Sequence, residues 1–242
     1  MKTLKILLLQ ARHKHDKARH EERQSFADRA GLDIEQIVPH DLLQSPPTLT
    51  QIRHCDALMV GGSGAYSVFK QNLPDQPAVL EVLAEVVEVG HPTFASCFGF
   101  QLLVTALGGK VIYDPDCMEV GTYELSLQKD GRADELFDYL PPRFNAQLGH
   151  KDRAKFLPAG VINLASSYCV EYQALRVPGK PIWATQFHPE MTGKENRIRF
   201  DRYVNEYASI YSPEELKAVL DRFADSPEAD QLIPRFLKTV FG

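Results

Sequence analysis

The chain contains few cysteines, and they are not spaced as metal ligands. Its 242 residues include four, at positions 55, 97, 117 and 169. They contain no Cys-x-x-Cys pair, and their spacing is not that of a zinc site or of a secreted disulfide framework. His13, His15 and His20 lie in a strongly charged segment, where a solvated polar face is favoured over a metal site. The sequence therefore predicts no metal and no cofactor.

The chain also lacks an excess of positive charge and a long apolar run. Lysine and arginine number 27 against 32 aspartates and glutamates, which gives a formal net charge of −5. A net negative charge does not favour binding of a polyphosphate chain, so nucleic acid is not expected as the main ligand. The apolar run Leu4–Leu9 is too short to span a bilayer or to act as a signal peptide. We therefore expect no membrane partner and a cytoplasmic protein.

A phosphate-binding loop is missing as well. The glycine-rich segment Gly61–Gly64 follows an apolar run, but it has neither the Walker spacing with its lysine nor the Gly-x-Gly-x-x-Gly pattern. No ATP-binding site is therefore predicted for this chain. A plain glycine turn remains the alternative to a functional role for this loop.

Short apolar runs alternate with amphipathic stretches along the chain. We expect strands at Leu4–Leu9, Leu32–Val38, Ala57–Val60 and Pro92–Ser96, and helices at Asp16–Ala30, Pro77–Val89 and Phe98–Leu107. Further strands are expected between Lys110 and Phe187, and the last of them should return to the main sheet. Strands that alternate with helices indicate a parallel sheet covered on both faces. The predicted fold is α/β, a doubly wound, mostly parallel, flavodoxin-like sheet with extra antiparallel strands and C-terminal helices.

The C-terminal region is expected to be helical. Ser212–Glu215 supplies an N-cap, a proline in the first turn and a capping-box glutamate, and Ser226–Glu228 starts a similar helix. Apolar residues such as Val219 and Phe236 form a stripe that packs on the domain, although a homodimer contact stays open. No linker or repeat is visible. We predict one domain over residues 1–242, with a core of about 4–205 and a helical extension over 212–242.

The most informative segment is Pro92–Gln101, in which an apolar strand passes directly into a helix through Cys97. Ala95 and Gly99 flank this cysteine at minus two and plus two, where a sharp strand-to-helix turn needs small side chains. Such a turn holds the sulfur at a helix N-terminus, which favours the nucleophilic thiolate. A buried structural cysteine is the alternative, and we expect the other three cysteines to be inert.

A nucleophilic thiol needs a base, and the base needs a partner that fixes its tautomer. The strand expected at Ile182–Phe187 runs into His188, Pro189 and Glu190. Pro189 cannot continue a ladder, and it keeps the preceding residue extended. His188 and Glu190 therefore project to the same side of the chain. Because catalytic groups collect at the carboxyl ends of parallel strands, we predict that His188 serves Cys97 as a base and that Glu190 orients it.

Attack by a thiolate on a carbonyl group generates an oxyanion, which needs N–H donors. The loop at Gly61–Gly64 leaves its backbone N–H groups bare of side chains. We predict that the N–H of Gly62 and that of Phe98, directly after the nucleophile, form the oxyanion hole.

Taken together, these segments resemble the class I glutamine amidotransferase family. The nucleophile motif of that family is approximately Gly-x-Cys-x-Gly-x-Gln, and Ala95–Gln101 matches it except at Ala95. Its second motif, Gln-Phe-His-Pro-Glu, is matched without change by Gln186–Glu190. The resemblance covers roughly residues 4–205, and stand-alone γ-glutamyl peptidases are similar to this chain too.

The resemblance implies that Cys97 attacks the side-chain amide of glutamine, that His188 protonates the departing ammonia, and that water cleaves a γ-glutamyl thioester. It also implies that Gln101 holds the glutamyl part of the substrate. Gly149 and His150 belong to a segment that is similar to a substrate-lining loop of the family.

The resemblance leaves two other functions open. A γ-glutamyl peptidase would use the same three residues on an isopeptide bond, and a catalytically idle binding or regulatory subunit would keep the fold alone. Since no synthetase domain follows, ammonia that is used would pass to a separate synthetase subunit. The expected ligand is glutamine or a γ-glutamyl compound.

Overall fold

Strands and helices alternate along the first part of the chain, as the sequence predicts. The computed structural model describes residues 4–208 and 211–242, so residues 1–3 and 209–210 of the predicted domain lie outside it. The strands are β1 (Ile6–Gln10), β2 (Ile37–Asp41), β3 (Ala57–Val60), β4 (Thr93–Ser96), β5 (Lys110–Tyr113), β6 (Glu119–Leu127), β7 (Arg143–His150), β8 (Asp152–Phe156), β9 (Ile162–Ser166), β10 (Ala174–Val177) and β11 (Ile182–Thr185). The α-helices are α1 (Lys17–Ala30), α2 (Leu49–Arg53), α3 (Gln76–Val89), α4 (Phe98–Ala106), α5 (Gly193–Ala208), α6 (Pro213–Leu220) and α7 (Leu232–Phe241).

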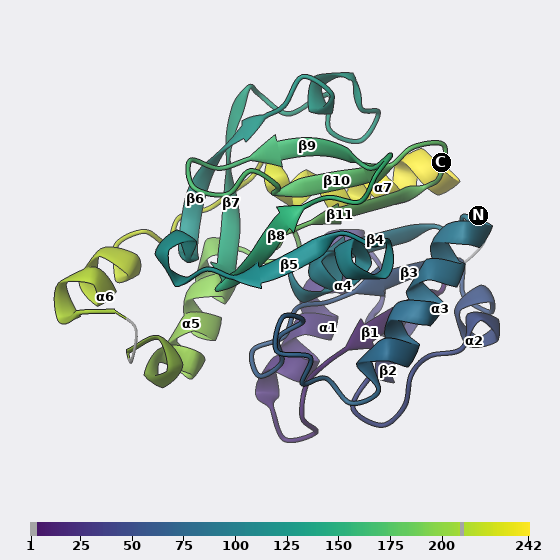
Figure 1. The fold of residues 1–242 in the computed structure, drawn as a ribbon, viewed down its shortest axis with the longest axis horizontal. Helices are drawn as coiled ribbons and strands as arrows, with labels where there is room; N and C mark the ends of the chain where they lie inside the picture. The colour runs from purple at the N-terminus through teal and green to yellow at the C-terminus, as the bar shows by residue number, and fades with distance from the viewer. Residues whose placement is uncertain (1–3, 209–210) are drawn as a thin grey trace.

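Nine strands form one sheet in the order β2-β1-β3-β4-β11-β10-β9-β6-β7 (Figure 1). The half from β2 to β11 is parallel, because β1 pairs with β2 and β3, and β4 pairs with β3 and β11, all in the same direction. β11 thus returns to the centre of the sheet beside β4. This order confirms the predicted doubly wound, flavodoxin-like arrangement.

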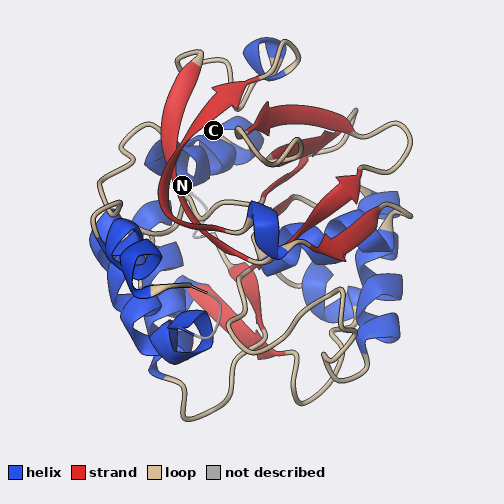
Figure 2. Cartoon of the chain, turned by 60° about the vertical axis from the view of Figure 1, so that its left-hand side comes forward, coloured by secondary structure: helices blue, strands red, loops and turns tan. Residues whose placement is uncertain are grey.

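Helices lie on both sides of the parallel strands (Figure 2). Alternate residues of β1 point to opposite faces, so Ile6 and Leu8 join one buried cluster while Leu7 and Leu9 join another. The first cluster includes residues of α1 and α7, and the second includes residues of α2, α3 and α4. Burial on both faces explains why β1 and β3 are nearly continuous apolar runs in the sequence.

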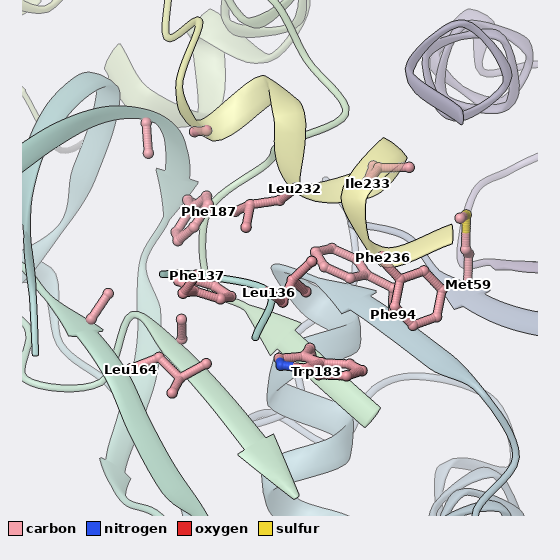
Figure 3. Packing of buried hydrophobic residues seen from close by; sticks show 14 of the residues in the cluster. Met59, Phe94, Leu136, Phe137, Leu164, Trp183, Phe187, Leu232, Ile233 and Phe236 are labelled. Carbon is pink, nitrogen blue, oxygen red and sulfur yellow. The ribbon is translucent and has the colours of Figure 1, made fainter. Parts of the chain in front are cut away.

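The C-terminal helix α7 covers one face of the sheet beside α1. Phe236 packs its ring against Phe94 of β4 and Trp183 of β11, at centroid distances of 5.6 and 5.9 Å (Figure 3). Leu232 and Ile233 of the same helix are fully buried. The apolar side of α7 therefore packs within the fold.

Beyond β11 the sheet becomes antiparallel, through β10, β9, β6 and β7. β5 and β8 pair in a separate two-stranded ribbon. α5 and α6 lie together at one side of the molecule, where α5 packs on β6 and β7 (Figure 1). Among the described residues, no helix combines the length and the apolar composition that crossing a bilayer requires.

The strand predicted at Leu32–Val38 is wrong at its start, since β2 begins only at Ile37. The residues before it form a turn in which the Asp33 N–H donates to Gln36 Oε1 (3.0 Å). β2 contains Pro39, which cannot donate to a ladder, and it is the edge strand of the sheet. An edge position is where a strand tolerates proline.

α6 begins as predicted. Ser212 Oγ accepts from the Glu215 N–H (3.3 Å), and the Glu215 carboxylate accepts from the Ser212 N–H (2.7 Å), which is a capping box. The helix predicted at Ser226 starts only at Leu232. Ser226 Oγ donates to the Asp230 carboxylate (3.1 Å), so this hydroxyl does not cap a helix.

Cys117 and Cys169 form a disulfide, which their spacing did not indicate. They lie 52 positions apart in sequence, and their Cα atoms are 5.5 Å apart where the turn before β6 meets the turn between β9 and β10. Pairing over this separation depends on the sheet topology, so spacing alone cannot reveal it. Cys55 and Cys97 are buried free thiols.

Candidate active site

Cys97 lies at the apex of a sharp turn between β4 and α4. Its backbone has φ 52° and ψ −102°, a conformation that residues with a side chain rarely adopt. The Cys97 N–H donates to the Thr185 carbonyl of β11 (2.7 Å), which ties the turn to the neighbouring strand. The cysteine is 5% exposed and borders a cavity of about 140 Å³. The predicted strand-to-helix turn around Cys97 is confirmed.

Gly99 lets α4 approach β3 closely. Its N–H donates to the Gly61 carbonyl (3.2 Å), and a Cβ atom at Gly99 would lie 2.6 Å from the carbonyl oxygen of Val60. A methyl group does not fit at that distance from a backbone oxygen. The small residue predicted at this position is therefore required by the crossing of helix and strand.

The substitution Gly99→Ala should lower the free energy of unfolding by about 2–3 kcal/mol, because the added methyl group overpacks a backbone contact. Denaturant unfolding followed by circular dichroism measures this change. Gly149→Ala is the matched control, since a Cβ atom there would meet no atom within 4 Å. We expect its stability to stay within about 0.5 kcal/mol of wild type. Equal stability of both variants would contradict the close approach of α4 to β3.

His188 and Glu190 form a buried pair beyond the end of β11. The strand ends at Thr185, two residues earlier than predicted, and the His188 N–H then donates to the Gln147 carbonyl of β7 (2.9 Å). His188 Nδ1 lies 2.6 Å from Glu190 Oε1, and the two side chains are 5% and 0% exposed. This contact leaves Nε2 for Cys97, whose thiol is close enough to the imidazole to influence its pKa. The structure thus brings the three residues together.

Burial alone would lower the pKa of His188. The negative charges of Glu190 and Cys97, together with the hydrogen bonds to both, outweigh burial and raise this pKa above its ordinary value. These surroundings therefore favour the protonated form of the imidazole. A thiolate beside an imidazolium is the attacking species of a cysteine nucleophile.

The two predicted oxyanion donors differ in their availability. Phe98 is the first residue of α4, and its N–H has no hydrogen-bond partner in the described part of the chain. The N–H of Gly62 instead donates to the buried carboxylate of Glu22 (3.0 Å). In this conformation Phe98 is free to donate to an oxyanion, and Gly62 is not.

The predicted substrate-binding residues line the same cavity as Cys97. Gln101, Gly149 and His150 all border it. Gln101 Nε2 donates to the Asp152 carbonyl (2.9 Å), which fixes the amide side chain. Gly149 and His150, whose segment is similar to a substrate-lining loop of the family, end strand β7, which pairs with β6 over its whole length.

A buried ion cluster next to His188 was missed in the sequence. Arg12, Arg199 and Tyr203 border a second cavity of about 40 Å³, which His188 also borders. Glu22 of α1 pairs with Arg12 (2.8 Å) and is fully buried, although the sequence of α1 is that of a charged, solvated helix. One signal could have indicated Arg12. It follows the apolar strand β1, at the carboxyl ends of the parallel strands, where functional groups collect.

Known proteins resemble this chain in both sequence and fold. It is 36% identical over 104 residues to a subunit of the glutamine-hydrolysing GMP synthase of Methanocaldococcus jannaschii, a match that covers 43% of this chain and 53% of that protein. It is 28% identical over 158 residues to the glutamine-hydrolysing GMP synthase of Aspergillus oryzae, covering 64% of this chain and 28% of that protein. The chain spans about a quarter of the length of such full synthases.

A glutamine amidotransferase from Thermotoga maritima has a similar crystal structure. The two structures align over 100% of both chains with a TM-score of 0.74, at 16% sequence identity. At that identity the likeness concerns the fold alone. The sequence match to a family is more specific. Residues 41–205 match the family described as glutamine amidotransferase class-I, which is more than half of the chain and includes Cys97, His188 and Glu190. With the fold and the family match in agreement, the chain belongs to the class I glutamine amidotransferases.

Proposed function

We propose that this protein hydrolyses the γ-carboxamide of glutamine through a γ-glutamyl thioester on Cys97. The observation that carries the proposal is the position of His188, which is held at Nδ1 by the buried Glu190 and lies near enough to the Cys97 thiol to interact with it electrostatically. Membership of the family supports it, and so do relatives named as glutamine-hydrolysing GMP synthases.

In the first step, the Cys97 thiolate attacks the amide carbon of the glutamine side chain. The carbon–nitrogen bond then breaks, and the proton on His188 goes to the departing nitrogen, which leaves as ammonia. The Phe98 N–H donates to the oxyanion of the tetrahedral intermediate. In the second step, the neutral His188 takes a proton from water, whose oxygen attacks the thioester and releases glutamate and the Cys97 thiol.

The cavity wall suits the charged end of an amino acid. Lys70 and the buried Asp152 both border the cavity, and the Asp152 carboxylate accepts from Ser67 Oγ. A cation and a carboxylate in one wall complement the α-carboxylate and the α-ammonium group of glutamine. The amide would then extend toward Cys97, beside Gln101.

A γ-glutamyl peptide is the second candidate substrate, because exposed aromatic rings lie beside the cavity. Tyr113, which borders the cavity, stacks on Phe69 at a centroid distance of 6.4 Å. The two rings are 40% and 49% exposed. They would contact the amine part of a peptide substrate, which free glutamine lacks.

Ammonia release from L-glutamine, measured beside amine release from a γ-glutamyl dipeptide, tests the proposal. We expect kcat/KM to be at least roughly tenfold higher for glutamine. Mass spectrometry of rapidly quenched protein should find a γ-glutamyl adduct on Cys97. A better rate with the dipeptide would favour the peptidase. Turnover of neither substrate, with no adduct, would contradict hydrolysis and leave a binding subunit.

We also propose that the ammonia passes to a separate synthetase polypeptide. Two relatives are themselves named as one subunit of a GMP synthase, which supports such a division between polypeptides. Addition of the accepting polypeptide should then raise the rate of glutamine hydrolysis, because ammonia-using enzymes gain from coupling the two reactions.

A further inference from the structure

Glu22 is a buried carboxylate that contacts the backbone of the glycine-rich loop. It lies on α1, is 0% exposed, and accepts from Gln10 Nε2 (2.9 Å), Arg12 Nη2 (2.8 Å) and the Gly62 N–H (3.0 Å). Burial alone would raise the pKa of Glu22, but the charge of Arg12 and its hydrogen bond outweigh burial and lower this pKa. Glu22 is therefore an ionised, charge-assisted acceptor for the Gly62 N–H.

In space, only Gly61 and Gly62 of the glycine-rich loop lie between the side chains of Glu22 and His188. A Cβ atom at Gly61 would lie 2.7 Å from Glu22 Cδ, and a Cβ atom at Gly62 would lie 2.8 Å from His188 Cε1. A side chain on either residue would force Glu22 or His188 to move. Glycine at both positions removes the Cβ atoms that would restrict rotation of the peptide between them, and such a rotation would also release the Gly61 carbonyl from the Gly99 N–H (3.2 Å). The Gly62 N–H can therefore face Glu22 or turn toward the Cys97 side of the loop.

Arg199 of α5 is a cation beside Glu22 that does not yet donate to it. Its Nη1 lies 3.9 Å from Glu22 Oε1, the same oxygen that accepts from Gly62. Arg199 Nε and Nη1 are shielded from solvent and have no hydrogen-bond partner among the described residues. Burial and the charge of Arg12 lower the pKa of Arg199, while the charges of Glu22 and Glu190 act against them. Unused donors on a buried cation are unfavourable, so a shift of Arg199 toward Glu22 would be stabilising.

We propose that Glu22 is a positioning residue that competes with the reaction's oxyanion for the Gly62 N–H, and that Arg199 replaces this N–H on Glu22 during catalysis. The inference rests on the proposed function, because only that reaction forms the oxyanion. In the free protein the N–H is bound to Glu22, and Phe98 alone is available. When the Gly62 peptide rotates, its N–H reaches the oxyanion and Glu22 Oε1 accepts from Arg199. The carboxylate is hydrogen-bonded in both arrangements.

The substitution Glu22→Gln tests this competition. The amide keeps the shape of the side chain but is a weaker acceptor, so the Gly62 N–H is released more easily. We expect kcat for glutamine to rise by roughly three- to tenfold while KM changes by less than about twofold, because the N–H acts only on the oxyanion. A residue with a merely structural role would lower kcat or leave it unchanged, and either result would overturn the inference.

Glu21→Gln is the matched control. Glu21 precedes Glu22 on the same helix and pairs with Arg202 (2.6 Å), so it does not touch the glycine loop. We expect this variant to keep the wild-type kcat. Thermal unfolding of both variants shows whether the proteins are folded during the assay. A rise of the same size in Glu21→Gln would assign the effect to a lost charge on α1, and the inference would be wrong.

Arg199→Gln keeps the inference testable if Glu22→Gln does not fold. Without the guanidinium, Glu22 has no donor to replace Gly62, so we expect kcat to fall by roughly tenfold with KM nearly unchanged. The two substitutions should thus change kcat in opposite directions, and a change in the same direction would contradict the competition. Absence of ammonia release by the wild type would end both proposals. Wild-type turnover without a rise in Glu22→Gln would contradict this one alone.

Discussion

Replacement of Cys97 by alanine is expected to lower glutamine hydrolysis by on the order of 10⁴-fold or more, because no thioester forms without the sulfur. The fold should survive. Alanine takes over a position with φ 52°, where its Cβ atom meets the same backbone strain as that of cysteine. Ammonia release and the mass of the quenched protein measure the loss of turnover and of the adduct.

Two further variants separate chemistry from stability at this turn. Cys97→Gly should be as inactive as Cys97→Ala but more stable by about 1 kcal/mol, since glycine adopts positive φ without strain. Cys55→Ala removes the other buried free thiol and should keep full turnover. Activity that persists in Cys97→Ala, or is lost equally in Cys55→Ala, would place the nucleophile elsewhere.

Replacement of Glu190 by glutamine should lower kcat by on the order of 10²–10⁴-fold, because the carboxylate fixes the tautomer and the orientation of the imidazole. The substitution weakens the contact between His188 Nδ1 and Glu190 Oε1, which lie 2.6 Å apart and are both buried. An amide offers a neutral oxygen in its place. Steady-state kinetics with glutamine should show the loss in kcat, with KM changed much less.

The same substitution should change the pH dependence in a defined direction. Burial acts to lower the pKa of His188, and the charges of Glu190 and Cys97 raise it. Loss of the Glu190 charge removes one of the causes that raise the pKa of His188, so this pKa falls and the imidazolium is lost at a lower pH. The alkaline limb of the kcat/KM profile should therefore move toward neutral pH.

Glu124→Gln controls for the general loss of a carboxylate. Glu124 is 58% exposed and pairs with Arg143 on the surface of β6 and β7. Its profile should coincide with that of the wild type. An alkaline limb that stays in place in Glu190→Gln would mean that this limb does not report the imidazolium.

The parts of the site that sequence reasoning found are encoded locally. The turn at Cys97 needs small neighbours within a few residues, and His188 and Glu190 belong to one tripeptide. The parallel half of the sheet was also predictable, because strands buried on both faces are continuous apolar runs. Local patterns of this kind can be recognised in the sequence without knowledge of the residues that pack against them.

What was missed depends on tertiary contacts. Glu22 looks like one more charge on a polar helix, and only the packing of α1 against the glycine loop makes it a buried acceptor for Gly62. Likewise, Gly149 and His150 follow a run with modest apolar content, and their pairing with β6 makes them extended. The prediction that the Gly62 N–H stabilises the oxyanion did not include Glu22 as a competing acceptor, because Glu22 is distant from Gly62 in sequence.

Because β4 is translated well before β11, the two strands can pair only late in synthesis. Ser96 lies beside Thr185 in these neighbouring strands, and β5 to β10 are all translated between them. A nascent chain that has left the ribosome only as far as β10 carries the thiol but not yet its imidazole. The proposed nucleophile therefore lacks its proposed base until β11 is in place, and the strand that completes the centre of the sheet brings the histidine with it.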